Sequence, residues 1–302
     1  MRLKELSTTC VSIPEIGLGT WHYTAGAHSL RKGLEAGALF IDTAESYGTE
    51  AIVGEAVAGM RDSVFIATKV SPQNFRCLAL RRSVDCSLLR LGIDVIDLLQ
   101  LHQPNPSVPI EETMGAMADL VDEGKVRFIG VSNFSAAQLQ EAQKASKKYR
   151  IVSNQVRYNL IDRTIERGLL QYCQKERVTV IAYSPFAREF GRIGDCDPSG
   201  VLDDLARTLG KSPAQIVLNW CLCKEGVVVI PKSNSAGHIL ENCAVSDWRL
   251  TTEQIHLLDT KIAYRHRNGL DALLRRFMPQ SVRKFAPQAL AYLPRSVRRR
   301  IQ

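Results

Sequence analysis

The stretch LFIDTAESYG, residues 39–48, begins as an unbroken apolar run and ends in a polar turn. A strand that is buried on both faces has a continuous apolar sequence of this kind, whereas a half-buried strand alternates between apolar and polar residues. The run therefore predicts a strand inside a parallel sheet. Asp42 ends this run, and Glu45 and Tyr47 follow in the turn, at the carboxyl end of the predicted strand.

Similar apolar, β-branched runs recur along the chain, and helical patterns separate them. The eight runs cover residues 15–21, 38–44, 64–70, 95–102, 128–133, 152–158, 178–185 and 227–233. Alternating strands and helices form a parallel sheet, and eight such units over about 250 residues are typical of a closed (β/α)8 TIM barrel. An open, doubly wound sheet is the alternative. The segment GLGTWHY, residues 17–23, lacks the third glycine of the dinucleotide-binding motif and so disfavours that alternative.

Two parts of the chain depart from simple alternation. Residues 186–226, between the seventh and eighth runs, are long enough for a loop and two helices. Two helical patterns, at residues 235–245 and 251–264, follow the eighth run. We therefore divide the chain into a barrel over residues 1–264, with extra C-terminal helices, and a tail over residues 265–302.

The composition excludes several classes of protein. The chain is 45% hydrophobic and 23% charged, as in soluble globular proteins. It has no apolar signal sequence and no run long enough to cross a bilayer, so we expect a cytoplasmic protein. The eight cysteines are scattered, which argues against a disulfide scaffold and against a zinc site, and we expect no bound metal.

The net charge of +8 is concentrated in the tail. The tail contains ten Lys or Arg and one acid, Asp271, so the preceding residues are close to neutral. Leu270, Leu273, Leu274 and Phe277 fall on one helical stripe. Short helices that pack over the barrel are the interpretation we favour, and weak contact with an anionic membrane surface is the alternative. The chain has no nucleic-acid recognition motif, so we expect no nucleic-acid partner.

Three successive predicted strands end in ionisable residues, namely Asp42, Lys69 and His102, and Tyr47 follows the first of them. Active sites of (β/α)8 barrels lie at the carboxyl ends of the strands, so we expect these side chains to meet there. Each could have a structural role alone. Near apolar walls, however, Asp42 and Lys69 require each other, because an unpaired buried charge is costly.

The chemistry of these groups suggests a proton transfer. A lysine ammonium beside a phenol is expected to lower the pKa of Tyr47, which would then act as a general acid, while His102 orients a substrate oxygen. Such a pair suits carbonyl reduction if a cofactor supplies hydride. Lys232 and Ser233 lead from the eighth strand into a helix, where barrels often bind phosphate. Glu45 has no evident partner in the sequence and is interpreted as a solvated loop charge.

The ordered motifs resemble those of the aldo-keto reductase superfamily from about residue 13 to residue 264. The matching segments are IPEIGLGTW, GALFIDTAESYGTEAIVGEA, ATKV, DLLQLH, GVSNF, NQVRYN, AYSP and IPKSNSAGHILEN. Each fragment is weak alone, but the ordered set is specific. The resemblance implies a (β/α)8 TIM barrel preceded by a β-hairpin, here formed by residues 2–6 and 11–16. It also implies reduction of an aldehyde or ketone, the small-molecule substrate, by hydride transfer from NADPH.

The resemblance further implies roles for individual residues. Tyr47 would be the proton donor, Lys69 and Asp42 would tune it, and His102 would orient the carbonyl. Trp21, Tyr47 and His102 would contact the substrate. The positions that would bind the cofactor are Gly19, Thr20, Trp21, Asp42, Ser132, Asn133, Gln155, Tyr183, Ser184, Phe186, Lys232, Ser233, His238, Glu241 and Asn242.

Different parts of the cofactor would contact different members of this set. Ser132, Asn133 and Gln155 would hold the nicotinamide carboxamide, the Tyr183 ring would stack on the nicotinamide, and Ser184 and Phe186 would border the pyrophosphate. Glu241 and Asn242 would contact the adenine.

The cofactor preference depends on the positions nearest the 2′-phosphate. Lys232 and Ser233 would grip this phosphate, which implies NADPH. His238 stands where many members have an arginine, and a neutral histidine neutralises less charge, so NADH is possible as well. The loop SPFAREFG, residues 184–191, replaces a commoner SPLG type of loop, and Arg188 could supply a cation there.

A second interpretation is a barrel that binds NADPH as a regulatory or channel-associated subunit with little turnover. Such a protein could retain all four polar groups at the strand ends, so kinetic measurement must distinguish the two. The sequence does not indicate an oligomeric state.

Overall fold

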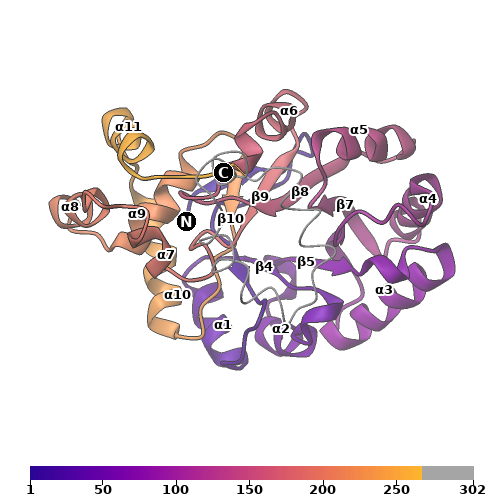
Figure 1. The fold of residues 1–302 in the computed structure, drawn as a ribbon. Coiled ribbons are helices and arrows are strands. Elements are labelled where there is room, and N and C mark those ends of the chain that lie inside the picture. The colour runs from indigo at the N-terminus through magenta and orange to yellow at the C-terminus, as the bar shows by residue number, and fades with distance from the viewer. Residues whose placement is uncertain (267–302) are drawn as a thin grey trace, which may run out of the picture.

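The computed structural model describes residues 1–266, and the predictions for the tail beyond residue 266 lie outside the described residues. The eight predicted strands form one parallel sheet in the order β3 to β10. Figure 1 shows these strands inside a ring of helices, which confirms the predicted barrel. The strands are β3 (Leu18–Gly19), β4 (Phe40–Asp42), β5 (Phe65–Val70), β6 (Ile96–Leu101), β7 (Val126–Ser132), β8 (Ile151–Arg157), β9 (Thr179–Tyr183) and β10 (Val227–Val229).

The first and last strands meet at a seam that closes the barrel. The Gly17 amide donates to the carbonyl oxygen of Val229 at 2.8 Å, and the Gly19 amide donates to that of Pro231 at 3.0 Å. A Cβ atom on Gly19 would lie 2.7 Å from the carbonyl oxygen of Ile230, so only glycine allows the two strands to approach this closely. The seam excludes the open sheet.

Helices cover the outer face of the strands. Ser135 caps the N-terminus of α5, because its hydroxyl accepts the amide hydrogen of Gln138. The long segment between β9 and β10 contains the two predicted helices, α8 and α9, and a short additional one, α7. The α-helices are α1 (Ala27–Glu35), α2 (Glu50–Val57), α3 (Cys77–Leu91), α4 (Ile110–Asp122), α5 (Ala136–Ala145), α6 (Leu169–Lys175), α7 (Gly191–Gly194), α8 (Val201–Leu209), α9 (Pro213–Leu222), α10 (Ala236–Cys243) and α11 (Thr252–Lys261).

Between residues 1 and 266, five short 3-10 helices lie in the connections. They are η1 (Glu45–Tyr47), η2 (Arg61–Ser63), η3 (Pro72–Asn74), η4 (Thr164–Glu166) and η5 (Ala244–Asp247). The first of them, η1, is the turn of the opening motif, and it ends at Gly48 in the left-handed conformation.

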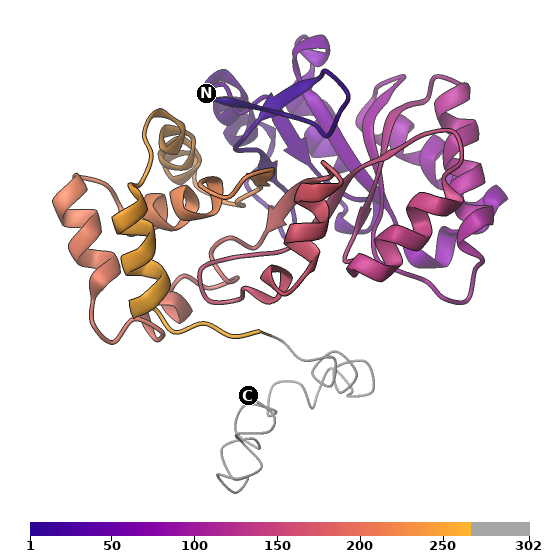
Figure 2. The same cartoon turned by 90° about the horizontal axis from the view of Figure 1, so that it is seen from above.

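The predicted N-terminal hairpin is present and closes one end of the barrel. Its strands are β1 (Leu3–Glu5) and β2 (Ser12–Pro14), which pair antiparallel. Leu6 and Ile13 are fully buried in a cluster with inward-facing strand residues such as Phe40. Figure 2 shows the hairpin lying across the strands, at the end of the barrel far from α11.

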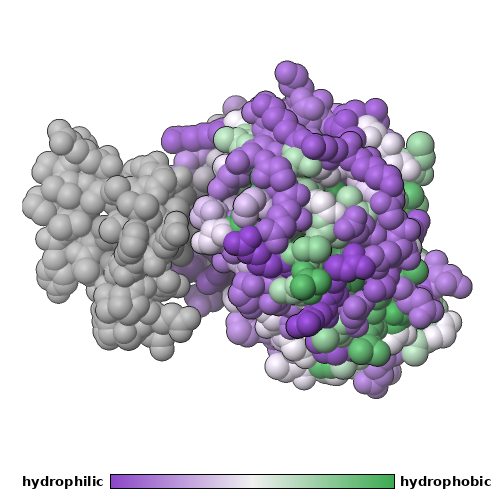
Figure 3. Space-filling model, turned by 90° about the vertical axis from the view of Figure 1, so that its right-hand side faces the viewer, coloured by the Kyte–Doolittle hydropathy of each residue, from purple (hydrophilic) through white to green (hydrophobic). Residues whose placement is uncertain are grey.

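A second apolar layer lies between the strands and the surrounding helices, and it forms the larger core cluster. The flank that carries α3 and α4 is mostly hydrophilic, with small separate apolar patches (Figure 3). Within residues 1–266, none of the helices combines the length and the apolar character that a membrane span requires.

Candidate active site

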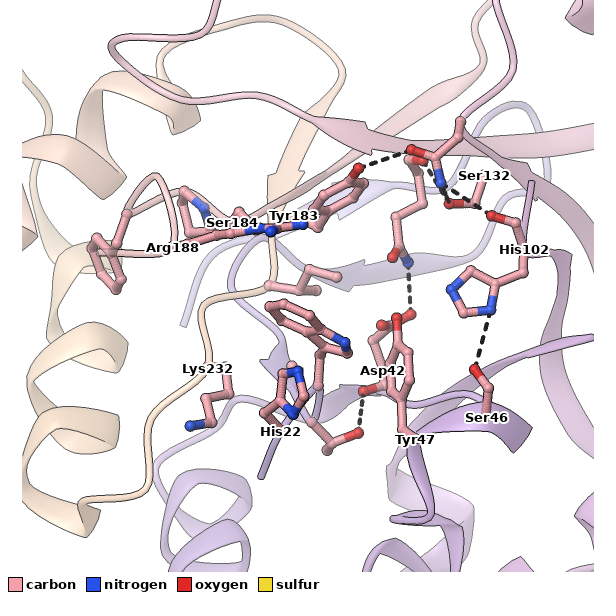
Figure 4. A pocket seen from close by; sticks show the side chains of 18 residues that line it. His22, Asp42, Ser46, Tyr47, His102, Ser132, Tyr183, Ser184, Arg188 and Lys232 are labelled. Carbon is pink, nitrogen blue, oxygen red and sulfur yellow. Dashed lines mark hydrogen bonds between the residues drawn. The ribbon is translucent and has the colours of Figure 1, made fainter. Parts of the chain in front are cut away.

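A cavity of about 520 Å³ opens where the parallel strands end (Figure 4). Strand ends and the loops that follow them supply its walls, as expected for a barrel of this type. The lining residues are Gly19, Thr20, Trp21, His22, Asp42, Ser46, Tyr47, His102, Ser132, Asn133, Gln155, Tyr183, Ser184, Pro185, Phe186, Arg188, Ile230 and Lys232.

An ion pair between Asp42 and Lys69 lies at the base of this cavity. The Lys69 Nζ is 2.5 Å from the Asp42 Oδ1, and the two side chains are 0% and 2% exposed. Lys69 also donates to the carbonyl oxygen of Thr43 at 2.7 Å, and Gln155 donates to the other Asp42 oxygen at 2.7 Å. Burial alone would lower the pKa of Lys69, but the neighbouring Asp42 and Tyr47 more than offset this and raise it. The lysine is therefore a permanent cation below the cavity floor.

The ring of Tyr47 lies above that cation. The Lys69 Nζ is 4.8 Å from the centre of the Tyr47 ring. The expected lowering of the Tyr47 pKa is wrong for the molecule without ligands. Burial of the phenol raises its pKa above the usual 10.0, and the opposing effect of Lys69 is smaller. Tyr47 therefore remains protonated at neutral pH and holds a proton that it can donate.

His102, at the end of β6, packs against Tyr47. The two ring centres are 5.5 Å apart and the rings meet edge to face. The pKa of His102 falls from 6.5 to about 4, because the ring is buried and because the Lys69 cation is close. The imidazole is consequently neutral at physiological pH and retains one N–H group for a hydrogen bond.

A chain of hydrogen bonds connects the predicted nicotinamide-binding residues. The Tyr183 hydroxyl donates to the Asn133 Oδ1 at 2.9 Å, and the Asn133 amide donates to the Ser132 hydroxyl and to the carbonyl oxygen of His102, both at 3.0 Å. Ser132 donates to the carbonyl oxygen of Gln155 at 2.9 Å. These contacts hold the side chains of Ser132, Asn133 and Tyr183 in a single arrangement against the cavity, anchored on the backbone of β8.

Several cavity residues adopt a left-handed backbone conformation that side chains disfavour. The φ angles are 53° at His22, 63° at Asn133, 50° at Ser184 and 75° at Arg188, with 56° at the adjacent Ala187. Such conformations are costly and concentrate at functional sites. The strained residues at the cavity lie in the three loops that follow β3, β7 and β9.

The mouth of the cavity is crossed by a contact between two loops. The Arg188 guanidinium lies 5.0 Å from the centre of the Trp21 ring, which is 41% exposed. Figure 4 shows Arg188 and Lys232 on the side of the cavity opposite Ser132 and His102. Cations thus gather at one end of the cavity, and the neutral imidazole and phenol lie at the other.

Four predicted cofactor residues do not line the cavity. Ser233 precedes α10, and His238, Glu241 and Asn242 lie within it, beyond Lys232. The Glu241 carboxylate accepts a hydrogen bond from the Ser212 hydroxyl at the start of α9. His238 is exposed, Ser233 and Glu241 are partly exposed, and Asn242 is buried.

The interpretation of Glu45 as a solvated charge is wrong. Its carboxylate accepts hydrogen bonds from the Ser71 amide at 2.6 Å, from the Asn74 side chain at 3.0 Å and from the Ser83 hydroxyl. These donors lower the pKa of Glu45, although burial of the carboxyl acts in the opposite direction.

Some cavity residues carry no obvious chemical signal in the sequence. His22, Ser46, Pro185 and Ile230 line the cavity beside predicted members. Adjacency in sequence was the only available indication, since each lies within two positions of a predicted site residue. Within residues 1–266, no cluster of side chains is suited to bind a metal ion.

Comparison with known proteins agrees with this geometry. Residues 15–263 match the model of the aldo/keto reductase family. The chain belongs to this family. It is thus an oxidoreductase built on the aldo/keto reductase barrel, as the resemblance implied.

Three relatives illustrate the similarity. Methylglyoxal reductase YeaE of Escherichia coli (strain K12) is 37% identical over 273 residues, which cover 87% of this chain and 95% of that protein. Glyoxal reductase of Bacillus subtilis (strain 168) is 32% identical, over 82% of this chain and 89% of that protein. A crystal structure of an aldo-keto reductase from Klebsiella pneumoniae in complex with NADPH is 35% identical and superposes with a TM-score of 0.80, covering 88% and 98% of the two chains.

Proposed function

We propose that this aldo/keto reductase uses NADPH to reduce a small aldehyde or ketone to the alcohol, with Tyr47 as the general acid. The observation that supports this most directly is the position of the Tyr47 ring, between the buried Lys69 cation and the neutral ring of His102. A proton donor, a nearby cation and a neutral hydrogen-bonding ring are the groups that carbonyl reduction requires of the protein.

The polar groups in the cavity fit a nicotinamide. The Gln155 Oε1 accepts no hydrogen bond from any residue within 1–266, so it is available to an amide N–H, while its Nε2 is already bonded to Asp42. Asn133 and Ser132 lie beside it and are linked to each other. The Tyr183 ring lines the same wall and offers a flat apolar face for stacking.

The opposite end of the cavity fits the phosphates. Lys232 lines the cavity and has no ion-pair partner among the described residues, and Arg188 and His22 line the same region. A cation without an ion-pair partner in the described part of the chain, such as Lys232, favours an anionic ligand in the cavity beside it. Lys232 and Ser233 would hold the 2′-phosphate of NADPH, which supports NADPH as the preferred cofactor.

The reaction would use groups that already lie together at the cavity. When bound, the reduced nicotinamide supplies the hydride that adds to the carbonyl carbon. The N–H of the neutral His102 ring holds the substrate oxygen, and Tyr47 donates its phenolic proton to that oxygen. The Lys69 cation stabilises the phenolate that forms, and Asp42 keeps the lysine in place. In the reverse direction, the same phenolate accepts the proton from an alcohol.

The relatives narrow the substrates worth testing first. Because one is named a methylglyoxal reductase and another a glyoxal reductase, small dicarbonyl compounds are our first candidates. Trp21, exposed at the cavity mouth, would form part of the substrate-binding wall together with Tyr47 and His102.

The decisive test is a substrate panel with the wild-type chain and with Tyr47→Phe. We expect NADPH oxidation with methylglyoxal, glyoxal and simple aldehydes, slower turnover with NADH, and a loss of kcat/KM of about 10²- to 10⁴-fold in the variant. Tight NADPH binding without Tyr47-dependent turnover on any carbonyl would instead support the regulatory or channel-associated subunit.

A further inference from the structure

Glu45 holds the turn that carries Tyr47, and it does so from outside the cavity. Its Oε1 accepts from the Ser71 amide and the Asn74 side chain, and its Oε2 accepts from the Ser83 hydroxyl. The side chain is half-buried and is absent from the cavity lining. Three donors are a large number for one half-buried carboxylate, and they lie directly after β5, in η3 and in α3.

The partners of Glu45 connect directly to the strand that carries Lys69. Ser71 follows that residue by two positions, immediately after β5, and Asn74 ends η3. A bond between Glu45 and this segment therefore fixes the η1 turn against the end of β5. The distance between the Tyr47 phenol and the Lys69 ammonium depends on how these two elements are placed.

The same segment also holds the loop that follows His102. The Asn105 side chain donates to the carbonyl oxygen of Pro72 at 2.8 Å. Residues 71–74 are thus bonded on one side to the turn of Tyr47 and on the other to the loop of His102. These bonds join the loops that follow β4, β5 and β6, the three strands whose ends carry Asp42, Lys69 and His102.

We propose that Glu45 is a positioning residue, which sets the place of the Tyr47 phenol relative to Lys69 and His102 through the segment 71–74. This role rests on the proposed reductase function. Glu45 does not line the cavity, so it acts through the turn and, at a distance, through its negative charge, which opposes the lowering of the His102 pKa. A displacement of about 1 Å in a reacting group is enough to reduce turnover strongly.

Two substitutions distinguish the effect of the Glu45 hydrogen bonds from the effect of its charge. Glu45→Ala removes all three hydrogen bonds, and we expect kcat with NADPH and a carbonyl to fall by about tenfold or more, with the KM for NADPH unchanged. Glu45→Gln keeps an oxygen that accepts from Ser71 and Asn74, and the Ser83 hydroxyl can turn to accept from the new amide. We therefore expect this variant to retain kcat within about twofold of wild type.

Asp197→Ala is the matched control. The Asp197 carboxylate likewise accepts three hydrogen bonds, from the amides of Val201 and Leu202 and from the Ser199 hydroxyl, but it does so at the start of α8, away from the cavity. We expect this variant to lose thermal stability and to keep the wild-type kcat. Equal losses of kcat in the Glu45 and Asp197 alanine variants would reduce Glu45 to a general structural role and overturn the proposal.

Hydrogen–deuterium exchange of the intact chain provides a measurement that does not need turnover. We expect Glu45→Ala to accelerate exchange in peptides that contain residues 45–49 and 71–74, and Asp197→Ala to leave both peptides unchanged. Unchanged exchange and unchanged kcat in Glu45→Ala would refute the proposal. If the wild-type chain showed no Tyr47-dependent turnover, the proposed function would fail, but the exchange data would still report whether Glu45 holds the turn.

Discussion

The two ends of the barrel differ in the polarity of the side chains that fill their interior. At the end where the strands begin, the hairpin residues Leu6 and Ile13 fill the interior with apolar side chains. At the end where the strands finish, the interior holds the Asp42–Lys69 ion pair and the neutral ring of His102.

The backbone does not divide in the same way. Four of the residues that line the cavity have positive φ angles without being glycine, among them Asn133 and Arg188, but so do Ser7 and Cys10 in the turn of the hairpin. The difference between the two ends therefore lies in their side chains. Buried charge reduces stability, and a well-packed apolar cluster increases it. One end of this barrel stabilises the fold, and the other end uses part of that stability to hold reactive groups in place.

The largest effect is expected from the buried ion pair, because its loss should reduce both stability and turnover. Asp42→Asn leaves the fully buried Lys69 without its counter-charge. We expect the free energy of unfolding to fall by about 3–5 kcal/mol and kcat to fall at least about a hundredfold. Urea denaturation and steady-state kinetics on the same preparation measure the two losses. A wild-type kcat in Asp42→Asn would show that the Lys69 ammonium keeps its position without Asp42.

The opposite end should respond in stability alone. Leu6→Ala leaves a hole in the apolar cluster, so we expect the free energy of unfolding to fall by about 2–5 kcal/mol. The kcat at a temperature well below the unfolding transition should equal that of wild type. A parallel fall in kcat would mean that packing at the hairpin end also affects the active site, and the two ends would then not be independent.

A smaller effect is expected at the cationic side of the mouth. Lys232→Gln removes a cavity-lining cation that has no ion-pair partner within residues 1–266. We expect the KM for NADPH to rise by about tenfold and the KM for NADH to change much less, because NADH lacks the 2′-phosphate. The ratio of the two values of kcat/KM is the measurement. An equal rise for both cofactors would place the lysine at a phosphate that they share.

The smallest effect is expected from pH, because neither His102 nor Tyr47 should change its protonation near neutral pH. His102 has a pKa of about 4 in place of 6.5, and burial raises the pKa of Tyr47 above 10.0. We therefore expect kcat/KM to be flat between about pH 5 and about pH 9. A fall near pH 6.5 would show that His102 titrates normally and that the mouth is wetter than its geometry indicates.

The shifted pKa of His102 also affects folding. Because the folded pKa lies below the unfolded value, the unfolded chain takes up the proton first as the pH falls. The contribution of the neutral, buried ring to stability is therefore complete above about pH 6.5 and is lost progressively toward pH 4. Denaturation midpoints measured across this range provide the check.

The sequence predicted the strands and the placement of the strand-end residues because both follow from local patterns. A buried parallel strand is an unbroken apolar run, and the residue after it must lie at the same edge as its neighbours. Asp42, Lys69 and His102 are brought together by this rule alone.

The remaining features depended on contacts between loops, which no local pattern specifies. Glu45 is bonded to Ser71, Asn74 and Ser83, all of them well separated from it in the sequence. The sign of the Tyr47 pKa shift depended on how deeply the neighbouring loops bury the phenol, and burial outweighed the adjacent cation. The sequence pattern predicts which charged side chains will meet. The direction of the Tyr47 pKa shift also depends on burial, which is set only by the assembled structure.

The seam between β3 and β10 has a consequence for biosynthesis. The bridge between Ile16 and Val229 joins the start of the barrel to its end, and Trp21 and Lys232 follow the two strands directly into the cavity. A ribosome must therefore produce nearly the whole barrel before both sides of the cavity exist. Contacts this distant in sequence form late in folding. A partly synthesised chain has no complete pocket, so ligand capture must follow synthesis of the last strand.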